Sequence, residues 1–468
     1  MTGKRKRKLA MPDTLIIVAS VVLLVAILSW IIPSGTYDYQ EMNINGRIRN
    51  VAIDGTYHTI DKSEVTTTGF LGFFSVLYRG CVEAADVIFM ILCCCGTFGV
   101  VVKTGAFHAG IGTILKKLKG KEILLVPIIM MIFGLGGSVF GMASEFYGFY
   151  PLIVGLGVAL GYDAMFGFAI IAVGEFVGFM GATLNPYSVG IAQTISSVEL
   201  YSGTGYRAIC FVIFMAISII YVMVYGRKIK KNPGASVVFG EKNIHAFDRD
   251  ELNEYSFTLK DGLVLLDVLV VLIVLMLGLI KWGWDFPQLC GLFLLMSMIA
   301  AAICKWSPNK WCSEFIDSAK TAMWGCILTG IAKAITVVMQ DAQIMDTVIY
   351  GLSNVLKNAP HAVSAQVMLV VQTLINFFIP SATGQASATM PIMAQLADII
   401  GVSRQTAVLA FQFGDGLSNI FWPTADIVII CGLGGISLQK WYKWFTPLFL
   451  ILFVTQAILL GIATGIGF

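Results

Sequence analysis

Residues 174–186 read GEFVGFMGATLNP, and residues 414–424 read GDGLSNIFWPT. Each stretch places a carboxylate, Glu175 or Asp415, inside an apolar segment and then interrupts that segment with small polar residues and a proline. A carboxylate at membrane depth is costly and is usually functional. A helix broken at that depth is tolerated only where it faces protein or a water-filled cavity. Finding the pattern twice predicts a transport site built from two similar halves.

The composition indicates a membrane protein that crosses the bilayer several times. Of its 468 residues, 57% are hydrophobic and 13% are charged, whereas a soluble domain is roughly 45–50% apolar and about 25% charged. Most of the ten cysteines lie in apolar runs such as 93–95 and are interpreted as small hydrophobic residues. The four histidines show no metal-ligand spacing, so we expect no metal site of that kind and no cofactor.

We predict an all-α polytopic membrane protein with about nine full-span helices. Their expected ranges are about 13–33, 82–102, 163–199, 206–226, 262–280, 287–304, 318–339, 404–436 and 445–466. Two of them, 163–199 and 404–436, contain the opening stretches and are expected to be broken. Two further apolar stretches, 122–160 and 362–400, are interrupted in the middle and are interpreted as re-entrant hairpins.

The segments between these spans are polar or amphipathic. Stretches 107–121 and 341–358 are amphipathic and are expected at the membrane interface. Residues 34–79 form the longest expected soluble loop, and 227–261 is a second polar loop.

The two halves of the chain form a repeat. Glu175 aligns with Asp415 at an offset of 240 residues, and Ser144 at the first hairpin tip aligns with Ser387 at an offset of 243. We therefore divide the chain into a first repeat (1–226), a cytoplasmic loop with a linker helix (227–286) and a second repeat (287–468). If the hairpins re-enter, the repeats are inverted, as in many transporters.

The distribution of positive charge agrees with a cytoplasmic N-terminus. Of the 31 Lys and Arg residues, 22 lie in segments that this orientation places inside, beginning with the run from Lys4 to Lys8. That run precedes an apolar segment too long for a typical signal peptide, so we expect a first transmembrane helix there.

Each hairpin tip and helix break is expected to meet near the middle of the membrane, where exposed helix ends and side-chain oxygens can bind a solute or Na⁺. The candidate substrate- or ion-binding residues are Ser138, Ser144, Glu145, Glu175, Thr183, Asn185, Ser381, Thr383, Ser387, Asp415, Ser418, Asn419 and Thr424. Na⁺ or H⁺ is left open as the coupling ion.

Structural roles compete with these assignments. Glu175 and Asp415 could instead cap the broken backbone, and Glu145 could face solvent. Asp163 and Asp398 are interpreted as interfacial, and Asp426 fits either role. Half of the hydroxyl groups could simply bond back to their own helices.

The sign of the buried charges favours a solute that carries positive charge. Apart from Lys333, no basic residue lies deep in a predicted core span, and a dianion site would usually contain Arg. A basic amino acid could place its carboxylate at helix N-termini and its cationic group on Glu175, Asp415 or both. Lys333 could neutralise one of the acids or contact the solute.

Several motifs resemble the YfcC-type carriers, which are grouped with DcuC and the ArcD-like basic amino acid antiporters in the ion transporter superfamily. They are residues 174–179 with 185–186, the tip from 137–138 to 144–145, and the segment 30–37. The resemblance implies a dimeric secondary carrier of the bacterial inner membrane whose substrate-binding site moves by an elevator-like motion. Related dicarboxylate carriers have Ser-Asn-Thr at the tips, whereas this chain has Ser144-Glu145-Phe146 and Ser387-Ala388-Thr389.

The sequence therefore predicts a secondary transporter that works by alternating access and exchanges or takes up a basic amino acid similar to arginine or ornithine. The alternative is a Na⁺- or H⁺-coupled C4-dicarboxylate symporter. The sequence contains no filter-like segment, which argues against an ion channel. It also contains no catalytic triad, so the chain is not expected to be an enzyme.

Overall fold

The computed structural model describes residues 13–44, 47–118, 122–241, 245, 256–357 and 363–468. The run Lys4–Lys8 lies outside these residues. The elements of the first part of the chain are α1 (Thr14–Ile31), β1 (Ser34–Thr36), β2 (Tyr39–Ile44), β3 (Arg47–Ala52), β4 (His58–Ile60), α2 (Phe70–Glu83), α3 (Ala85–Lys103), α4 (Ala106–Leu118), α5 (Leu125–Leu135), α6 (Phe149–Ala159), α7 (Ala164–Met180), α8 (Val189–Ile195) and α9 (Thr204–Lys231). Those of the second part are α11 (Leu259–Lys281), α12 (Phe286–Ile303), α13 (Pro308–Lys320), α14 (Met323–Asp341), α15 (Met345–Lys357), α16 (Ser364–Phe378), α17 (Ala382–Ile399), α18 (Arg404–Ser418), α19 (Asp426–Gly434) and α20 (Leu438–Gly465).

Seven of the described helices are long and apolar enough to cross a membrane. They are α1, α3, α9, α11, α12, α14 and α20. They coincide with the seven unbroken helices expected from the sequence, which confirms a multi-pass helical membrane protein. The expected helix at 318–339 begins later, at Met323, because residues 308–320 form the separate helix α13.

The four expected interruptions are present. The segment 163–199 is divided into α7 and α8, and the segment 404–436 into α18 and α19. In the first hairpin, a π-helical turn (Gly136–Phe140) and a short 3₁₀ turn (Ser144–Phe146) separate α5 from α6. In the second, Pro380 follows α16, and Ser381 caps the N-terminus of α17 by accepting a hydrogen bond from the Gly384 amide. That the hairpins turn back within the membrane stays a prediction.

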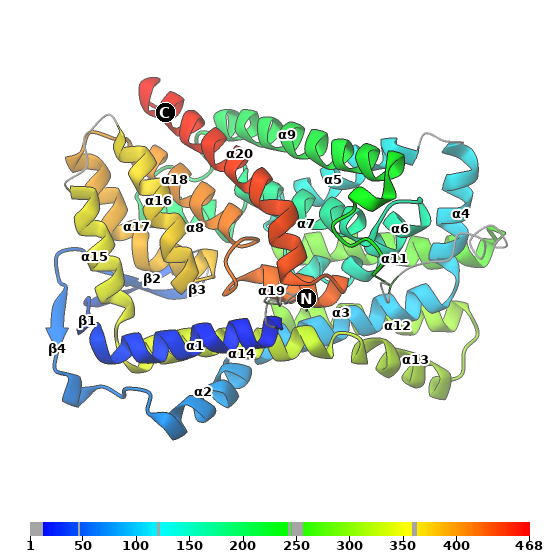
Figure 1. The fold of residues 1–468 in the computed structure, drawn as a ribbon, viewed down its shortest axis with the longest axis horizontal. Helices are drawn as coiled ribbons and strands as arrows, with labels where there is room; N and C mark the ends of the chain where they lie inside the picture. The colour runs from blue at the N-terminus through cyan, green and yellow to red at the C-terminus, as the bar shows by residue number, and fades with distance from the viewer. Residues whose placement is uncertain (1–12, 45–46, 119–121, 242–244, 246–255, 358–362) are drawn as a thin grey trace, which may run out of the picture.

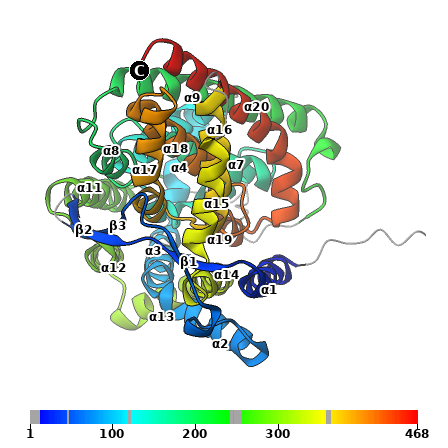
Figure 2. The same cartoon turned by 90° about the vertical axis from the view of Figure 1, so that its left-hand side faces the viewer.

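The helices are arranged as two bodies (Figures 1 and 2). One is a layer of α1, α2, α3, α12, α13 and α14, which we call the scaffold layer. The other contains both hairpins, both broken helices, α9 and α20, and we call it the core body; it lies on one side of the scaffold layer in both views.

In the scaffold layer, helices of one predicted repeat pack against helices of the other. Helices α1 and α2 come from the first half of the chain but pack against α14 of the second, while α12 and α13 pack against α3 of the first. Within the core body, α7 packs between α5, α6 and α9, just as α18 packs between α16, α17 and α20. Two halves with similar folds are expected to show this matched packing.

Glycines permit the closest helix contacts in the core body. A Cβ atom on Gly178 of α7 would lie 2.5 Å from the Cα atom of Gly134 on α5. A Cβ atom on Gly416 of α18 would lie 2.8 Å from the backbone nitrogen of Met180 on α7. At Gly416 the two broken helices therefore cross with their backbones nearly touching, which a side chain at position 416 would prevent.

The segment 34–79, expected as an irregular soluble loop, contains two small antiparallel sheets, β1–β4 and β2–β3, followed by α2. These residues were predicted as a polar loop, and the four strands in them were not predicted. Asp346 of α15 fixes the sheets to the helices, because its carboxylate accepts hydrogen bonds from the Tyr37 amide at 3.0 Å and the Tyr39 hydroxyl at 2.8 Å.

Candidate functional site

A cavity of about 520 Å³ lies between the scaffold layer and the core body. This volume falls within the roughly 300–1,000 Å³ that small-molecule sites occupy. The scaffold side contributes residues of α2, α3, α12 and α14. The core side contributes both hairpin tips and the break between α18 and α19. Segments that are distant in sequence thus meet at one solute-sized space.

The cavity contains charges of both signs. Lys333 enters from α14 in the scaffold layer, and Asp426 from the first turn of α19 in the core body. Glu83, an exposed residue at the end of α2, adds a second carboxylate. None of the ion pairs between described residues includes Lys333 or Asp426.

Tyr147 positions Asp426. The Tyr147 hydroxyl, from the first hairpin tip, donates a 2.8 Å hydrogen bond to Oδ1 of Asp426. Tyr147 also lines the cavity. The contact joins the first hairpin to the second helix break and fixes the orientation of the carboxylate.

The N-termini of two half-helices open on the cavity. Ser381 and Gly384, at the start of α17, line it, as do Thr424 and Ala425 immediately before α19. The free amide groups and partial positive charge of such helix ends favour a negatively charged group. The buried Thr424 hydroxyl oxygen has no hydrogen-bond partner among the described residues.

Glu175 and Asp415 do not line this cavity. Both are fully buried, and each has one hydrogen-bonded and one unpartnered carboxylate oxygen. Tyr150 donates to Glu175 at 2.8 Å, and the Asn376 amide donates to Asp415 at 2.9 Å. Each carboxylate is thus held by the hairpin of its own half.

The remaining predicted residues divide into two groups. Those that line the cavity are Ser144, Ser381 and Thr424. Those that lie outside it are Ser138, Glu145, Thr183, Asn185, Thr383, Ser387, Ser418 and Asn419.

Several of the residues outside the cavity connect the tips and breaks. Ser138 at the first tip contacts Thr183 in the first break, with 3.1 Å between the two hydroxyl oxygens. Thr383 at the second tip donates to the Tyr187 carbonyl in the same break at 2.9 Å. These contacts hold both hairpins against the break in the first broken helix.

Other predicted residues are bound locally. Glu145 is buried rather than solvent-facing, and its carboxylate accepts a hydrogen bond from the Ala143 amide. Asn185 accepts hydrogen bonds from the amides of Tyr187 and Ser188. The hydroxyls of Ser387 and Ser418 donate to carbonyls one turn earlier in their own helices. A structural role accounts for these contacts.

The predicted binding residues did not include Lys333, Asp426 or Tyr147, which line the cavity, or Asn376, which donates to Asp415. Asn376 lies in the apolar helix α16, one turn after Gln372. Two amide side chains one turn apart in an apolar helix are a sequence signal that could have identified Asn376. Tyr147 gave no such signal, because its role depends on a partner 279 residues away.

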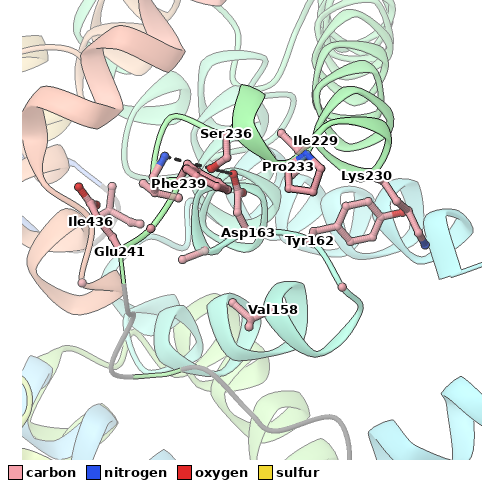
Figure 3. Close-up of a pocket in the computed structure, with 15 residues that line it drawn as sticks. Val158, Tyr162, Asp163, Ile229, Lys230, Pro233, Ser236, Phe239, Glu241 and Ile436 are labelled. Carbon is pink, nitrogen blue, oxygen red and sulfur yellow. Dashed lines mark hydrogen bonds between the residues drawn. The ribbon is translucent and has the colours of Figure 1, made fainter.

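A second cavity of about 510 Å³ lies at the end of α9 (Figure 3). Asp163 caps α7 there and accepts hydrogen bonds from Tyr225 at 2.5 Å and Ser236 at 2.6 Å. Lys230 lies over the Tyr162 ring. No predicted binding residue lines this cavity. Its contacts fix the segment after α9 to the start of α7, so we interpret them as structural.

Seven helices long enough to cross a membrane and a solute-sized cavity between two bodies are features of a membrane transporter. A family model described as "DcuC: C4-dicarboxylate anaerobic carrier" matches residues 11–465. The chain therefore belongs to the DcuC family, whose members are carriers and not enzymes.

Two curated relatives match along their full length. A protein of Escherichia coli named "Putative basic amino acid antiporter YfcC" is 32% identical, with 100% of this chain and 99% of the relative covered. An uncharacterised protein of Haemophilus influenzae is 27% identical, with 99% of both chains covered.

Two solved transporters align with the structure. The YdaH transporter of Alcanivorax borkumensis aligns with a TM-score of 0.44 and 15% identity, over 98% of this chain and 99% of that one. The MtrF efflux pump of Neisseria gonorrhoeae aligns with a TM-score of 0.43 and 16% identity, over 97% and 96%.

Proposed function

We propose that the chain is an alternating-access secondary carrier whose solute binds in the cavity between the scaffold layer and the core body. The observation that carries the proposal is that Lys333 and Asp426 line the same cavity from the two opposing bodies. If the core body moves relative to the scaffold layer, Asp426 travels with the solute and Lys333 does not. Such a displacement would expose the site to each side in turn.

The proposed solute is a basic amino acid, exchanged for a related one. Its carboxylate would bind at Lys333 and the N-terminus of α17, and its amino or guanidinium group at Asp426. Two carboxylates, Asp426 and Glu83, against the single cation Lys333 leave an excess of negative charge in the cavity. A solute with net positive charge compensates that excess, whereas a dianion increases it. The name of the Escherichia coli relative agrees with this solute class.

The proposed cationic subsite is Asp426 rather than Glu175 or Asp415. The latter two carboxylates are fully buried and lie outside the cavity. They remain in the proposal as residues that affect transport through the hairpins that hold them.

A C4-dicarboxylate is the second candidate. The N-termini of α17 and α19 and the ammonium group of Lys333 are all suited to carboxylates. The description of the family model names this solute class. In this case uptake would be coupled to Na⁺ or H⁺.

Proteoliposomes containing the purified chain distinguish the two candidates. Vesicles loaded with unlabelled arginine should accumulate labelled arginine, and succinate should not compete. Uptake of labelled succinate driven by a Na⁺ or pH gradient, with no uptake of arginine, would establish the second candidate instead.

The proposed arrangement in the cell is a homodimer in the bacterial inner membrane with a cytoplasmic N-terminus. The repeats are proposed to be inverted, with residues 1–226 and 287–468 as the two units and 227–286 as the connection. The charge distribution along the sequence and the exchange of helices in the scaffold layer support this arrangement.

A further inference from the structure

The cavity at the end of α9 lies apart from the solute cavity and shares no lining residue with it (Figure 3). Its volume of about 510 Å³ is nearly the same as that of the solute cavity. Its walls are formed by the corner between α6 and α7, the end of α9 with the segment that follows, and two residues directly after α19. Both predicted repeats therefore contribute to it.

Aromatic side chains indicate that this cavity lies at the membrane surface. Helices α9 and α20 are both long and apolar enough to cross a membrane. Tyr221 and Tyr225 of α9 pack against Trp444 of α20, with ring centroids 5.2 and 5.6 Å apart. Tyrosine and tryptophan gather at the level of the lipid headgroups. Lys230 follows Tyr225 by roughly 7–8 Å along the helix, at about 1.5 Å per residue. The cavity therefore opens at headgroup depth.

The end of α9 carries a concentration of positive charge. Its exposed basic residues are Arg227, Lys228, Lys230 and Lys231. None of the ion pairs between described residues includes any of them. Lys230 lines the cavity, with its ammonium nitrogen 5.0 Å from the centroid of the Tyr162 ring. The face of an aromatic ring attracts a cation but does not neutralise its charge.

The two carboxylates that line the cavity are bound within the protein. Asp163 accepts hydrogen bonds from one amide and two hydroxyl groups. Glu241 is ion-paired with Lys440 at 3.1 Å. Of the three charged residues that line the cavity, Lys230 alone forms no ion pair or side-chain hydrogen bond within the described part of the chain. The charge left uncompensated in the cavity is thus positive, which favours an anionic ligand.

The other walls of the cavity are largely apolar. Val158, Ile229, Val238 and Ile436 line it. Phe239 also lines it and is 65% exposed, next to the basic end of α9. Apolar surface left open at this depth gains by contact with hydrocarbon. An ammonium group beside apolar walls suits an amphiphile that carries a phosphate, whereas a small soluble anion would use only the ammonium group.

We propose that this cavity binds an anionic phospholipid. The lipid phosphate contacts the Lys230 ammonium group, and the glycerol and first acyl methylenes lie against Val158, Ile229 and Phe239. Basic pockets between transmembrane helices are typical sites for anionic headgroups. Because the walls come from both repeats, a bound lipid connects the two halves of the core body. The site does not depend on which solute the other cavity binds.

Thermal unfolding of the purified full-length chain in a neutral detergent tests the proposal. Phosphatidylglycerol should raise the Tm saturably, because a ligand that binds only the folded state stabilises it. Phosphatidylcholine with the same acyl chains should not. Glycerol phosphate, which has the phosphate but no acyl chains, should bind at least tenfold more weakly than phosphatidylglycerol. Equal shifts by the two lipids would overturn the proposal, and an equal response to glycerol phosphate would overturn it in favour of a soluble anion.

Two variants at exposed positions test the two parts of the site. Lys230→Gln removes the charge and Phe239→Ser removes apolar wall, so each should weaken the phosphatidylglycerol response at least tenfold. Lys310→Gln is the matched control, because Lys310 also lies over an aromatic ring, that of Trp306 at 4.3 Å, but does not line this cavity. An unchanged response in Lys230→Gln or Phe239→Ser, or an equal loss in Lys310→Gln, would contradict the assignment.

Discussion

Tyr147 is the residue whose contribution to the solute site is most easily isolated. Its hydroxyl donates to Asp426, and a hydrogen bond to a charged group contributes about 1.5–3 kcal/mol. Tyr147→Phe keeps the ring and removes this bond, so we expect roughly a tenfold or greater loss of solute affinity, since about 1.4 kcal/mol corresponds to tenfold. Solute titration of the purified variant, read out by the Tm, checks this. Tyr206→Phe, which removes a hydroxyl bonded to the Leu459 carbonyl outside the cavity, is the control. Equal losses in both variants would contradict a specific role for Tyr147.

Gly416 is the residue on which the crossing of the broken helices depends. Gly416→Ala would place a methyl group against the backbone of Met180, and overpacking of this kind costs about 1–3 kcal/mol. The Tm of the variant should fall accordingly. Gly205→Ala is the matched control, because nothing lies within 4 Å of its Cβ position in the first turn of α9. An unchanged Tm in Gly416→Ala would show that the two helices can separate without cost.

At the scale of the elements, Asp163 connects the start of α7 to the segment after α9. Asp163→Ala removes an N-cap, at about 0.5–2 kcal/mol, and leaves the hydroxyls of Tyr225 and Ser236 without their acceptor. We expect a lower Tm and faster tryptic cleavage at the basic end of α9. Asp13→Ala removes an exposed N-cap that bonds no such hydroxyls, so its Tm should fall less than that of Asp163→Ala. Equal effects in the two variants would contradict the connecting role.

The sequence was sufficient to predict the elements that follow from local chemistry. Pro380 and the glycines at 134–141 interrupt apolar runs, and the structure has interruptions there. The small sheets in 34–79 were missed because their strands are short and polar and are fixed mainly by Asp346, far along the chain. Lys333 was recognised as a basic residue in a predicted core span, whereas Asp426 was left between an interfacial and a functional role. That they share a cavity depends on packing between the two bodies, which no local pattern encodes.

At the scale of the whole molecule, the proposed orientation can be tested with a native cysteine. Cys312, on α13, is exposed, while the other nine cysteines are buried or half-buried. The proposed topology places α13 on the cytoplasmic side, so a membrane-impermeant maleimide should label Cys312 in inside-out vesicles and not in intact cells. Cysteine introduced at the exposed position Ser63, in a Cys312→Ser background, should give the opposite result. Labelling of Cys312 from outside intact cells would reverse the orientation.

In the proposed function, a solute's positive charge binds Asp426 in the cavity between the scaffold layer and the core body. The most direct test is the exchange of labelled arginine in proteoliposomes by wild type, Asp426→Asn and the exposed control Asp317→Asn. Loss of a charged hydrogen-bond partner costs about 1.5–3 kcal/mol, so kcat/KM should fall roughly 10- to 100-fold in Asp426→Asn. The control should match the wild type. Arginine exchange that is unchanged in Asp426→Asn would contradict the account.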